Sequence, residues 1–516
     1  MRYLCRVALV IFYCLYATSA LALQQDQQSI RSLIVLGLES NLGLKMESID
    51  VAKAKESLEI EKSAFDSTFF AAAEYDRSST PYESNYSLSS DSHAENLAGR
   101  FGVSKTFKTG LQTTLTLDSK WTTDNDTSDN LDPRYRTALL LELNQPLLQN
   151  LGFSVNTTQL NISKNQQRQA ALEYLLRAQN LILQLEVVAR QLAAQTEIIQ
   201  LRQQSLTLAK ELLRANQKRF DAGVIPITEI QQAETEVAAR QLSLSLAMQD
   251  QEILQEGLNR QLNHRLPDDF KPENLVDFKQ RMNEPLLPDF NILFDIAQQQ
   301  RIELKINDFS VQNSSLQHDY LRNQLKPQLD LKLQLGVNGL SGHERTSTMT
   351  SEYSGNWFNS FGSMSAADGY QWQAGLEFTM PIGNRLAKSR YRQSELQLKQ
   401  DRYREKDLRT MIKDDVLQQQ INISQTKQQL EITERFVALA QTSLDQEQQR
   451  LHEGLSDTFR IISFQQKLAE AKIDRINAIT RYQLALAQMD FALGQTFERH
   501  NFILTRNAEE LTLENI

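Results

Sequence analysis

The chain has 516 residues, of which 41% are hydrophobic and 23% are charged, and its formal net charge at pH 7 is -9. This acidic balance argues against a nucleic acid as partner, because phosphate backbones are bound by basic surfaces. The two cysteines, Cys5 and Cys14, both lie near the N-terminus. A mature chain without them would have no disulfide, no catalytic thiol and no cysteine ligand for a metal.

Residues 1–22 have the pattern of a secretory signal peptide. Arg2 and Arg6 give a basic start, residues 7–16 form an apolar core, and Ala20-Leu-Ala22 is a cleavage site. An uncleaved membrane anchor is the alternative, but the apolar run is short for a bilayer span. Cleavage would change the net charge from -9 to -11, because Arg2 and Arg6 are lost and no acid is. No later stretch approaches about 18 apolar residues, so no transmembrane helix is expected.

Residues 23–264 are predicted to form the first of two similar halves. An amphipathic helix at 29–64 comes first, and then the apolar period changes from 3.6 to 2. Strands are expected within about 68–145, at 68–76, 99–107, 110–121 and 135–145, with polar loops at 76–96 and 122–134. On the third strand, Leu115, Leu117 and Trp121 share one face, while polar residues occupy the other. The strand region therefore has one apolar and one polar face.

A pair of long helices follows the strands. No proline occurs between Pro146 and Pro226, so a helix is predicted over 153–220, about 100 Å long at 1.5 Å per residue. It carries an apolar residue every seventh position, the pattern of a seam that packs on another helix: Leu185, Leu192, Ile199, Leu206 and Leu213. Gly223 is expected in the left-handed conformation that ends helices, and a return helix is expected at 227–263.

The same pattern occurs a second time, 231 residues later. The seam positions then fall on apolar residues (Val416, Ile423, Leu430, Val437 and Leu444), and Gly223 falls on Gly454. We interpret this as an internal duplication, although two unrelated coiled coils that share a period are the alternative. After a proline-rich linker at 265–288, the second half covers 289–497. It should contain a helix at 289–324, strands within about 328–380, a loop at 339–369 and long helices at 384–452 and 457–496. A tail at 498–516 follows.

The strands suit a membrane barrel. Segments of about ten residues with one apolar and one polar face are typical of transmembrane barrels. Trp121, Tyr135, Tyr370 and Trp372 lie near strand ends, where an aromatic girdle would be placed. An antiparallel sheet with one face in water explains the strands equally well. The signal peptide, the missing cysteines and the polar loops favour the membrane.

The order of these elements resembles the outer-membrane efflux protein family, the TolC-like channels. The resemblance rests on the signal peptide, on Pro146 and Pro381 at the strand-to-helix exits, and on the stretch Arg219–Glu234 with its second copy at Arg450–Glu470. It covers nearly all of the mature chain. Its motifs are individually weak, and the duplicated order carries it.

The resemblance implies a fold class that is mainly α with a transmembrane β-barrel, in which three chains form one closed barrel and a helical tube. The family's location is the cell outer membrane, with the helices extending into the periplasm. The implied function is an exit duct that conducts substrates passively for a tripartite efflux pump or a type I secretion system. The implied partners are a periplasmic adaptor protein, an inner-membrane transporter and outer-membrane lipid. Family members have two strands per half, whereas four are expected here in the first half.

The helix turns would form the periplasmic tip, where the family's gate lies. The candidates from alignment on the glycines are Gly223, Thr228, Glu229, Gly454, Ser456, Arg460 and Ser463. Arg460 and Ser463 occupy the places of an acidic pair that rings the pore in the best-known member, so the gate must be locked differently here. Three copies of Arg460 in a narrow pore would favour anions. Alternatively, Arg460 faces a neighbouring helix and pairs with an acid.

No enzyme activity, cofactor or metal site is expected. The six histidines lack ligand spacing, and the chain has no phosphate-binding loop, G-x-S-x-G or H-E-x-x-H motif. A secreted or periplasmic coiled-coil scaffold or adhesin is the main alternative function. It explains the signal peptide and the heptads, but neither the strands before each long helix nor the duplication.

Overall fold

The structure is a computed structural model that describes residues 30–81, 91–125, 130–267, 270, 272, 288–345, 351–506 and 511–514. The predicted signal peptide, most of the linker at 265–288 and parts of the tail at 498–516 lie outside these residues. The chain divides into two compact units. The first comprises Met1–Ala52, Arg168–Asp308 and Arg404–Ile516, and the second comprises Lys53–Gln167 and Phe309–Tyr403.

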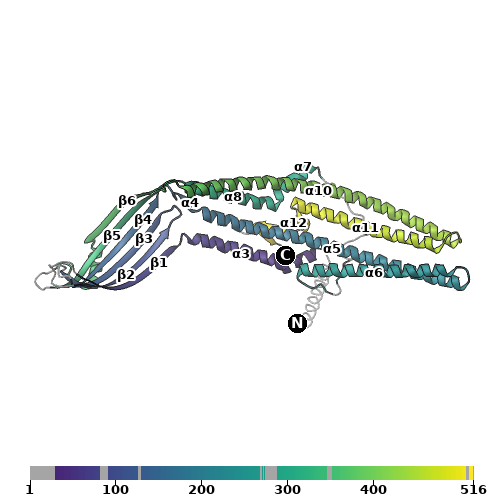
Figure 1. Ribbon diagram of the computed structural model, residues 1–516, viewed down its shortest axis with the longest axis horizontal. Helices are drawn as coiled ribbons and strands as arrows, with labels where there is room; N and C mark the ends of the chain where they lie inside the picture. The colour runs from purple at the N-terminus through teal and green to yellow at the C-terminus, as the bar shows by residue number, and fades with distance from the viewer. Residues whose placement is uncertain are drawn as a thin grey trace, which may run out of the picture. The chain divides into compact units, whose positions relative to one another are not determined.

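The described elements occur in two rounds of the same order (Figure 1). The first round contains α2 (Ile30–Ser40), α3 (Leu42–Ser63), β1 (Ser67–Pro81), β2 (Asp91–Thr106), β3 (Gln112–Asp124), β4 (Leu131–Pro146), α4 (Phe153–Asn156), α5 (Thr158–Asp221) and α6 (Ile227–Leu262). The second contains α7 (Phe290–Gln300), α8 (Ile302–Asn323), β5 (Gln328–Glu344), α9 (Trp357–Ser365), β6 (Gly369–Thr379), α10 (Arg385–His452) and α11 (Thr458–Leu493). The chain ends with α12 (Thr496–Arg499), β7 (Ile503–Arg506) and β8 (Leu511–Glu514). The duplicated architecture that the sequence predicts is confirmed.

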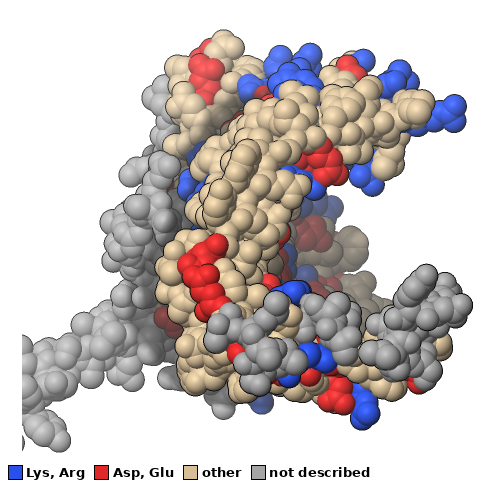
Figure 2. Space-filling view, turned by 90° about the vertical axis from the view of Figure 1, so that its left-hand side faces the viewer, with Lys and Arg blue, Asp and Glu red and all other residues tan. Residues whose placement is uncertain are grey.

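The second unit is built on one antiparallel sheet of six strands in the order β1 to β6. Seen from its loop end, the sheet curves into an open arc (Figure 2). The register keeps apolar residues on one face across the strands, since Phe101 lies opposite Leu117, Leu117 opposite Leu139, and Leu335 opposite Trp372. Many of these side chains are exposed in the single chain, as Leu335 is at 51%. The first half thus contributes four strands to a continuous sheet.

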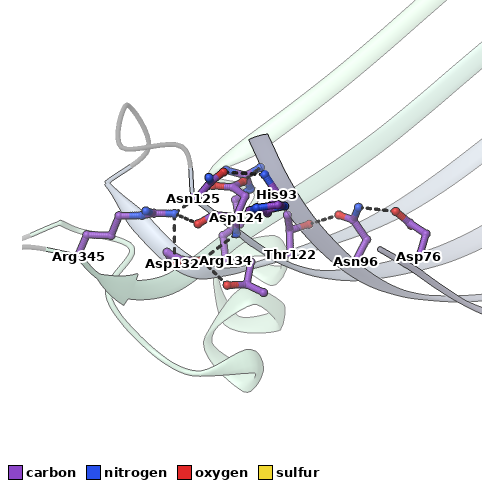
Figure 3. Close-up of polar contacts among 10 residues, drawn as sticks. Asp76, His93, Asn96, Thr122, Asp124, Asn125, Asp132, Arg134 and Arg345 are labelled. Carbon is purple, nitrogen blue, oxygen red and sulfur yellow. Dashed lines mark hydrogen bonds and ion pairs between the residues drawn. The ribbon is translucent and has the colours of Figure 1, made fainter. Parts of the chain in front are cut away.

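The strands are longer than the sequence indicates, because polar side chains bond to one another where loops were expected at 76–96 and 122–134. Asn96 Nδ2 donates to Asp76 Oδ2, and Thr122 Oγ1 donates to Asn96 Oδ1, both at 2.8 Å (Figure 3). Beside them, Arg345 pairs with Asp124 at 3.0 Å and with Asp132 at 3.2 Å. These side-chain contacts join β1 to β2, β2 to β3, and the residue after β5 to β3 and β4, where the backbone ladder reaches the loop end of the sheet.

Several expectations about continuous segments were wrong. The helix expected at 153–220 is interrupted at Thr157, between α4 and α5. The segment expected as a loop at 339–369 contains the end of β5, the helix α9 and the start of β6. The helices expected at 29–64 and 289–324 are each broken in two. Asn41 separates α2 from α3, because its Oδ1 accepts the backbone N–H of Leu44 at 3.0 Å and so caps a new helix. Arg301 separates α7 from α8.

The first unit is a set of long helices packed side by side. Helix α11 packs on α10 and α7 in a core of apolar residues that includes Val416, Ile423, Tyr482 and Met489. A second cluster, nearer the helix turns, joins Leu444 of α10 to Leu468 of α11. Of the nine predicted seam residues, Leu185, Leu192, Leu206, Ile423 and Leu444 are buried, and Ile199, Leu213, Leu430 and Val437 are partly buried. No described helix has a stretch apolar and long enough to cross a bilayer.

Candidate functional site: the helix turns

The two helix turns have the same backbone geometry. Gly223 and Gly454 adopt φ angles of 75° and 76°, which L-amino acids with a side chain rarely adopt. In the first turn the N–H of Gly223 donates to Phe220 O at 2.8 Å, and the N–H of Val224 donates to Arg219 O at 2.9 Å. The second turn repeats both bonds, from Gly454 to Leu451 O and from Leu455 to Arg450 O. Each turn is therefore a Schellman motif that satisfies carbonyls at the end of a long helix.

The gate candidates do not all meet. Thr228 and Ser463 line one groove of about 550 Å³ between α6 and α11, together with Gln232, Phe459 and Ile462. Glu229 lies in the first turn of α6, where a carboxylate is favourable beside the positive end of the helix dipole. Its backbone carbonyl, rather than its side chain, is bonded to another helix.

Ser456 is held within its own helix hairpin. Its hydroxyl donates to Glu447 Oε1 at 2.5 Å, and the guanidinium of Arg450 lies 3.6 Å from Glu447 Oε2. The side chain of Glu447 is 7% exposed, so this contact compensates a carboxylate that is nearly removed from water. Ser456 therefore fixes the turn between α10 and α11.

Arg460 has an acidic partner on its own helix. The side chain of Asp457 caps α11 by accepting the backbone N–H of Arg460 at 2.8 Å, and its other oxygen lies 3.8 Å from Arg460 Nε. The Arg460 side chain is 53% exposed. An ion pair this exposed holds the side chain weakly, so the guanidinium can reach other positions around the turn.

Asn216 links the two helix pairs, and the sequence analysis missed it. Its side chain is only 1% exposed, and its Nδ2 donates to Thr458 Oγ1 at 3.1 Å and to the carbonyl of Glu229 at 3.3 Å. These bonds tie α5 to α11 and to α6. A signal was available, because Asn216 lies three residues after the seam residue Leu213. A polar side chain inside a coiled-coil seam commonly fixes the register of the helices.

A second buried polar cluster lies around Glu186. The side chain of Glu186 is 2% exposed and forms an ion pair with Arg190, and Arg499 and His500 approach it at 3.7 and 3.5 Å. Burial alone would raise the pKa of Glu186, but the contact from His500 and the charges of Arg190 and Arg499 outweigh it and lower that pKa to about 2. Burial lowers the pKa of Arg499, against the attraction of Glu186. The cluster ties the last residue of α12 and the residue after it to α5. Within the described ranges, no group of side chains is arranged to hold a metal ion.

Comparisons with known proteins support the fold. A model of the outer membrane efflux protein family matches residues 293–495. The fold is similar to those of the outer-membrane channel OprN (14% identity, TM-score 0.62, covering 91% of each chain) and the Campylobacter jejuni outer membrane channel CmeC (16%, 0.62, covering 90% of this chain and 86% of that one). It is also similar to the outer membrane protein VceC from Vibrio cholerae (12%, 0.60, covering 90% of this chain and 96% of that one). No curated protein matches the sequence.

The resemblance to the outer-membrane efflux protein family is therefore confirmed. The family model covers the second half of the chain, and the structural matches extend the same fold over both halves. The predicted fold class, mainly α with a duplicated order of helix, strands and long helix pair, is confirmed with it.

Proposed function

We propose that the chain forms the outer-membrane exit duct of a tripartite efflux pump and works as a homotrimer. The sheet lies in the outer membrane, and the helices extend into the periplasm. An inner-membrane transporter supplies the energy, and a periplasmic adaptor protein joins the transporter to the duct. The duct itself conducts passively and needs no catalytic residue. Secretion of a polypeptide in a type I system is the same proposal with a different cargo.

The open sheet carries this proposal. One face is apolar across all six strands, and the outward edges of β1 and β6 have no strand partner within the described chain. An unpaired backbone edge cannot face lipid, because each unsatisfied group costs several kcal/mol there. Other copies of the chain must therefore close the sheet, with β6 of one copy beside β1 of the next. Three copies of six strands give a barrel of eighteen, a size that leaves an aqueous channel.

The helices also support assembly. Helices α6 and α10 lie at the two margins of the first unit, with α5 and α11 between them (Figure 1). Each marginal helix has a stripe of exposed apolar side chains: Leu242, Leu246 and Ile253 on α6, and Leu417, Ile421, Ile432, Phe436 and Leu439 on α10. Burying the exposed part of each would contribute about 1 kcal/mol, so the two stripes together favour association by roughly 8 kcal/mol. Contact with neighbouring copies covers them.

The helix turns form the gate in this proposal. Gly223 and Gly454 shape the two turns. The residues that line the pore or contact the adaptor there are Thr228, Glu229, Ser456, Arg460 and Ser463. Asn216 bonds to the carbonyl of Glu229 within the first hairpin, and Ser456 bonds to Glu447 within the second. The contact of Asn216 with Thr458 joins the hairpins. Opening then requires that this contact breaks while the hairpins stay intact.

The decisive experiment is conductance across a planar bilayer, with protein extracted from membranes in detergent and its mass measured by light scattering. We expect a trimer that inserts and gives discrete, long-lived openings. Replacing Arg460 by Gln and by Glu should shift the ion selectivity from anions toward cations in two steps, because the pore charge falls in steps. Ion selectivity that is unchanged by both substitutions would show that Arg460 does not line the pore. A folded protein that neither inserts nor conducts would refute the duct and favour the coiled-coil scaffold.

A further inference from the structure

Helix α9 lies on the apolar face of the sheet, where a barrel strand would otherwise face lipid. Trp357 Nε1 donates to Ser119 Oγ at 2.8 Å, the hydroxyls of Ser360 and Thr137 are 2.8 Å apart, and Ser341 Oγ donates to the carbonyl of Asn356 at 2.8 Å. Every second residue of a strand points to the same face of the sheet. Ser119 lies two residues from Leu117 on β3, and Thr137 lies two residues from Leu139 on β4. The hydroxyls that hold α9 thus belong to the apolar face.

The sheet is adapted to receive this helix. Gly339 lies opposite Thr137 in the ladder between β4 and β5. A Cβ atom at Gly339 would lie only 2.0 Å from the carbonyl oxygen of Ser360 and 2.5 Å from the backbone nitrogen of Met364. Only glycine therefore permits the helix to approach so closely. Small residues serve the same purpose where helices pack inside membranes.

The exposed residues of α9 carry no charge, and they include two aromatic rings beside the smaller Asn359, Gly362 and Ser365. The sequence of α9 is Trp-Phe-Asn-Ser-Phe-Gly-Ser-Met-Ser, and Ser360 on its inner side is fully buried. Phe358 is 73% exposed and Trp357 is 40% exposed, and the rings of both lie against one another at 5.1 Å. Amphipathic helices that combine a polar side with Trp and Phe on the other are suited to the membrane interface.

Neighbouring copies of the chain cannot easily cover these rings. The contacts of α9 are to β3, β4 and β5, in the middle of the sheet, whereas a closed barrel joins copies at β1 and β6. Trp121 and Tyr135 lie opposite one another, two residues beyond Ser119 and Thr137 toward the loop end. Aromatic residues at this level mark the boundary between headgroups and acyl chains.

We propose that α9 is an interfacial anchor, whose outer side binds the acyl chains of the outer leaflet just below the headgroups. The proposal rests on the proposed function, because it requires the apolar face of the sheet to meet lipid. Phe358 and Trp357 insert beside the strands, and the hydroxyls of Ser119, Thr137 and Ser360 hold the helix against the barrel. The helix fixes the depth of the barrel at its outer rim.

The test measures which surfaces lipid can reach. Without Cys5 and Cys14 the mature chain is free of cysteine, so Phe358→Cys, Leu335→Cys and Lys120→Cys each carry one environment-sensitive fluorophore. The labelled trimers are placed in phosphatidylcholine vesicles whose acyl chains are brominated near the carbonyl end or near the middle. Leu335 lies on the apolar face of the sheet, and Lys120 is exposed on the opposite face. Bromine quenches only a fluorophore that it contacts.

We expect the label at position 358 to lose most emission with bromine near the carbonyl end, the label at 335 with bromine near the middle, and the label at 120 with neither. Adding Gly339→Ala should lift α9 and change quenching at 358 but not at 335. Gly375→Ala is the matched control, because a Cβ there meets nothing within 4 Å. No quenching at 358 while 335 is quenched overturns the anchor and leaves the duct intact. No quenching at 335 overturns the duct itself.

Discussion

Removing the Asn216 side chain should loosen the helix turns without unfolding the chain. Asn216→Ala deletes the bonds to Thr458 Oγ1 and to the carbonyl of Glu229, and it leaves both acceptors without that donor in a buried place. Each such bond contributes about 1 kcal/mol net, so the loss is about 2 kcal/mol. That energy corresponds to an increase of about 30-fold in the equilibrium for local opening.

Amide hydrogen exchange measures this opening directly. Peptides that cover the starts of α6 and α11 should exchange about 30-fold faster in Asn216→Ala, whereas peptides from the middle of α5 should not change. The proportion of time that single channels spend open should rise with it. Gln217→Ala is the matched control, because Gln217 is exposed and its amide donates to Asp221 on the same helix, at 3.0 Å. Equal exchange in the two variants would refute the inference that Asn216 joins the hairpins.

Three further predictions concern other parts of the chain. Glu186→Gln should lower the free energy of unfolding at neutral pH by about 3 kcal/mol, because the pKa of Glu186 in the folded chain is about 2 and its usual value is 4.5. This contribution to stability is present above pH 4.5 and is lost as the pH falls toward 2. The melting temperatures of wild type and variant should therefore converge in acid. Gly223→Ala should lower the melting temperature, because a left-handed conformation costs alanine about 1 kcal/mol. Gly257→Ala within α6 should raise the melting temperature, because alanine favours a helix and a Cβ there meets nothing within 4 Å. Equal shifts in the two variants would contradict the assigned turn geometry. Deletion of residues 67–111 joins the end of α3 to β3 and removes the hairpin of β1 and β2. Single-channel conductance should fall, because a barrel with fewer strands is narrower. An unchanged conductance would place the hairpin outside the pore wall.

The repeated periods made most of the fold predictable. A seven-residue seam and a two-residue alternation are each set by which side of an element is apolar, so they identify helix and strand before any contact is known. Because Gly223 and Gly454 lie 231 residues apart, like the seams, the duplication was visible too. The strand ends could not be predicted from the sequence, because their pairing depends on polar contacts between strands, such as that of Asn96 with Asp76.

The site was harder to predict than the fold. Thr228 and Ser463 share a groove, but their role in a gate stays a prediction. The contact that joins the hairpins is made by Asn216, a residue that alignment on the two glycines does not single out. Helix α9 escaped detection because Gly362 interrupts a short stretch of low helix propensity, and tertiary contacts with Ser119 and Thr137 stabilise it. Local patterns predict elements, whereas the partners of isolated polar residues depend on the assembled structure.

In the proposed trimer, the additional hairpin would make the perimeter of the barrel match that of the helices. Strands lie about 4.8 Å apart and tilt by about 40°, so each occupies about 6.3 Å of the perimeter of a barrel. Eighteen strands then need about 113 Å, whereas twelve need about 75 Å. Each chain also contributes the ends of four helices to the second unit, from α3, α5, α8 and α10, and twelve helices at about 9.5 Å spacing occupy about 114 Å. In the proposed trimer, a duct built with β1 and β2 would therefore not narrow where strands meet helices, which agrees with the proposal that passage is controlled at the turns of Gly223 and Gly454.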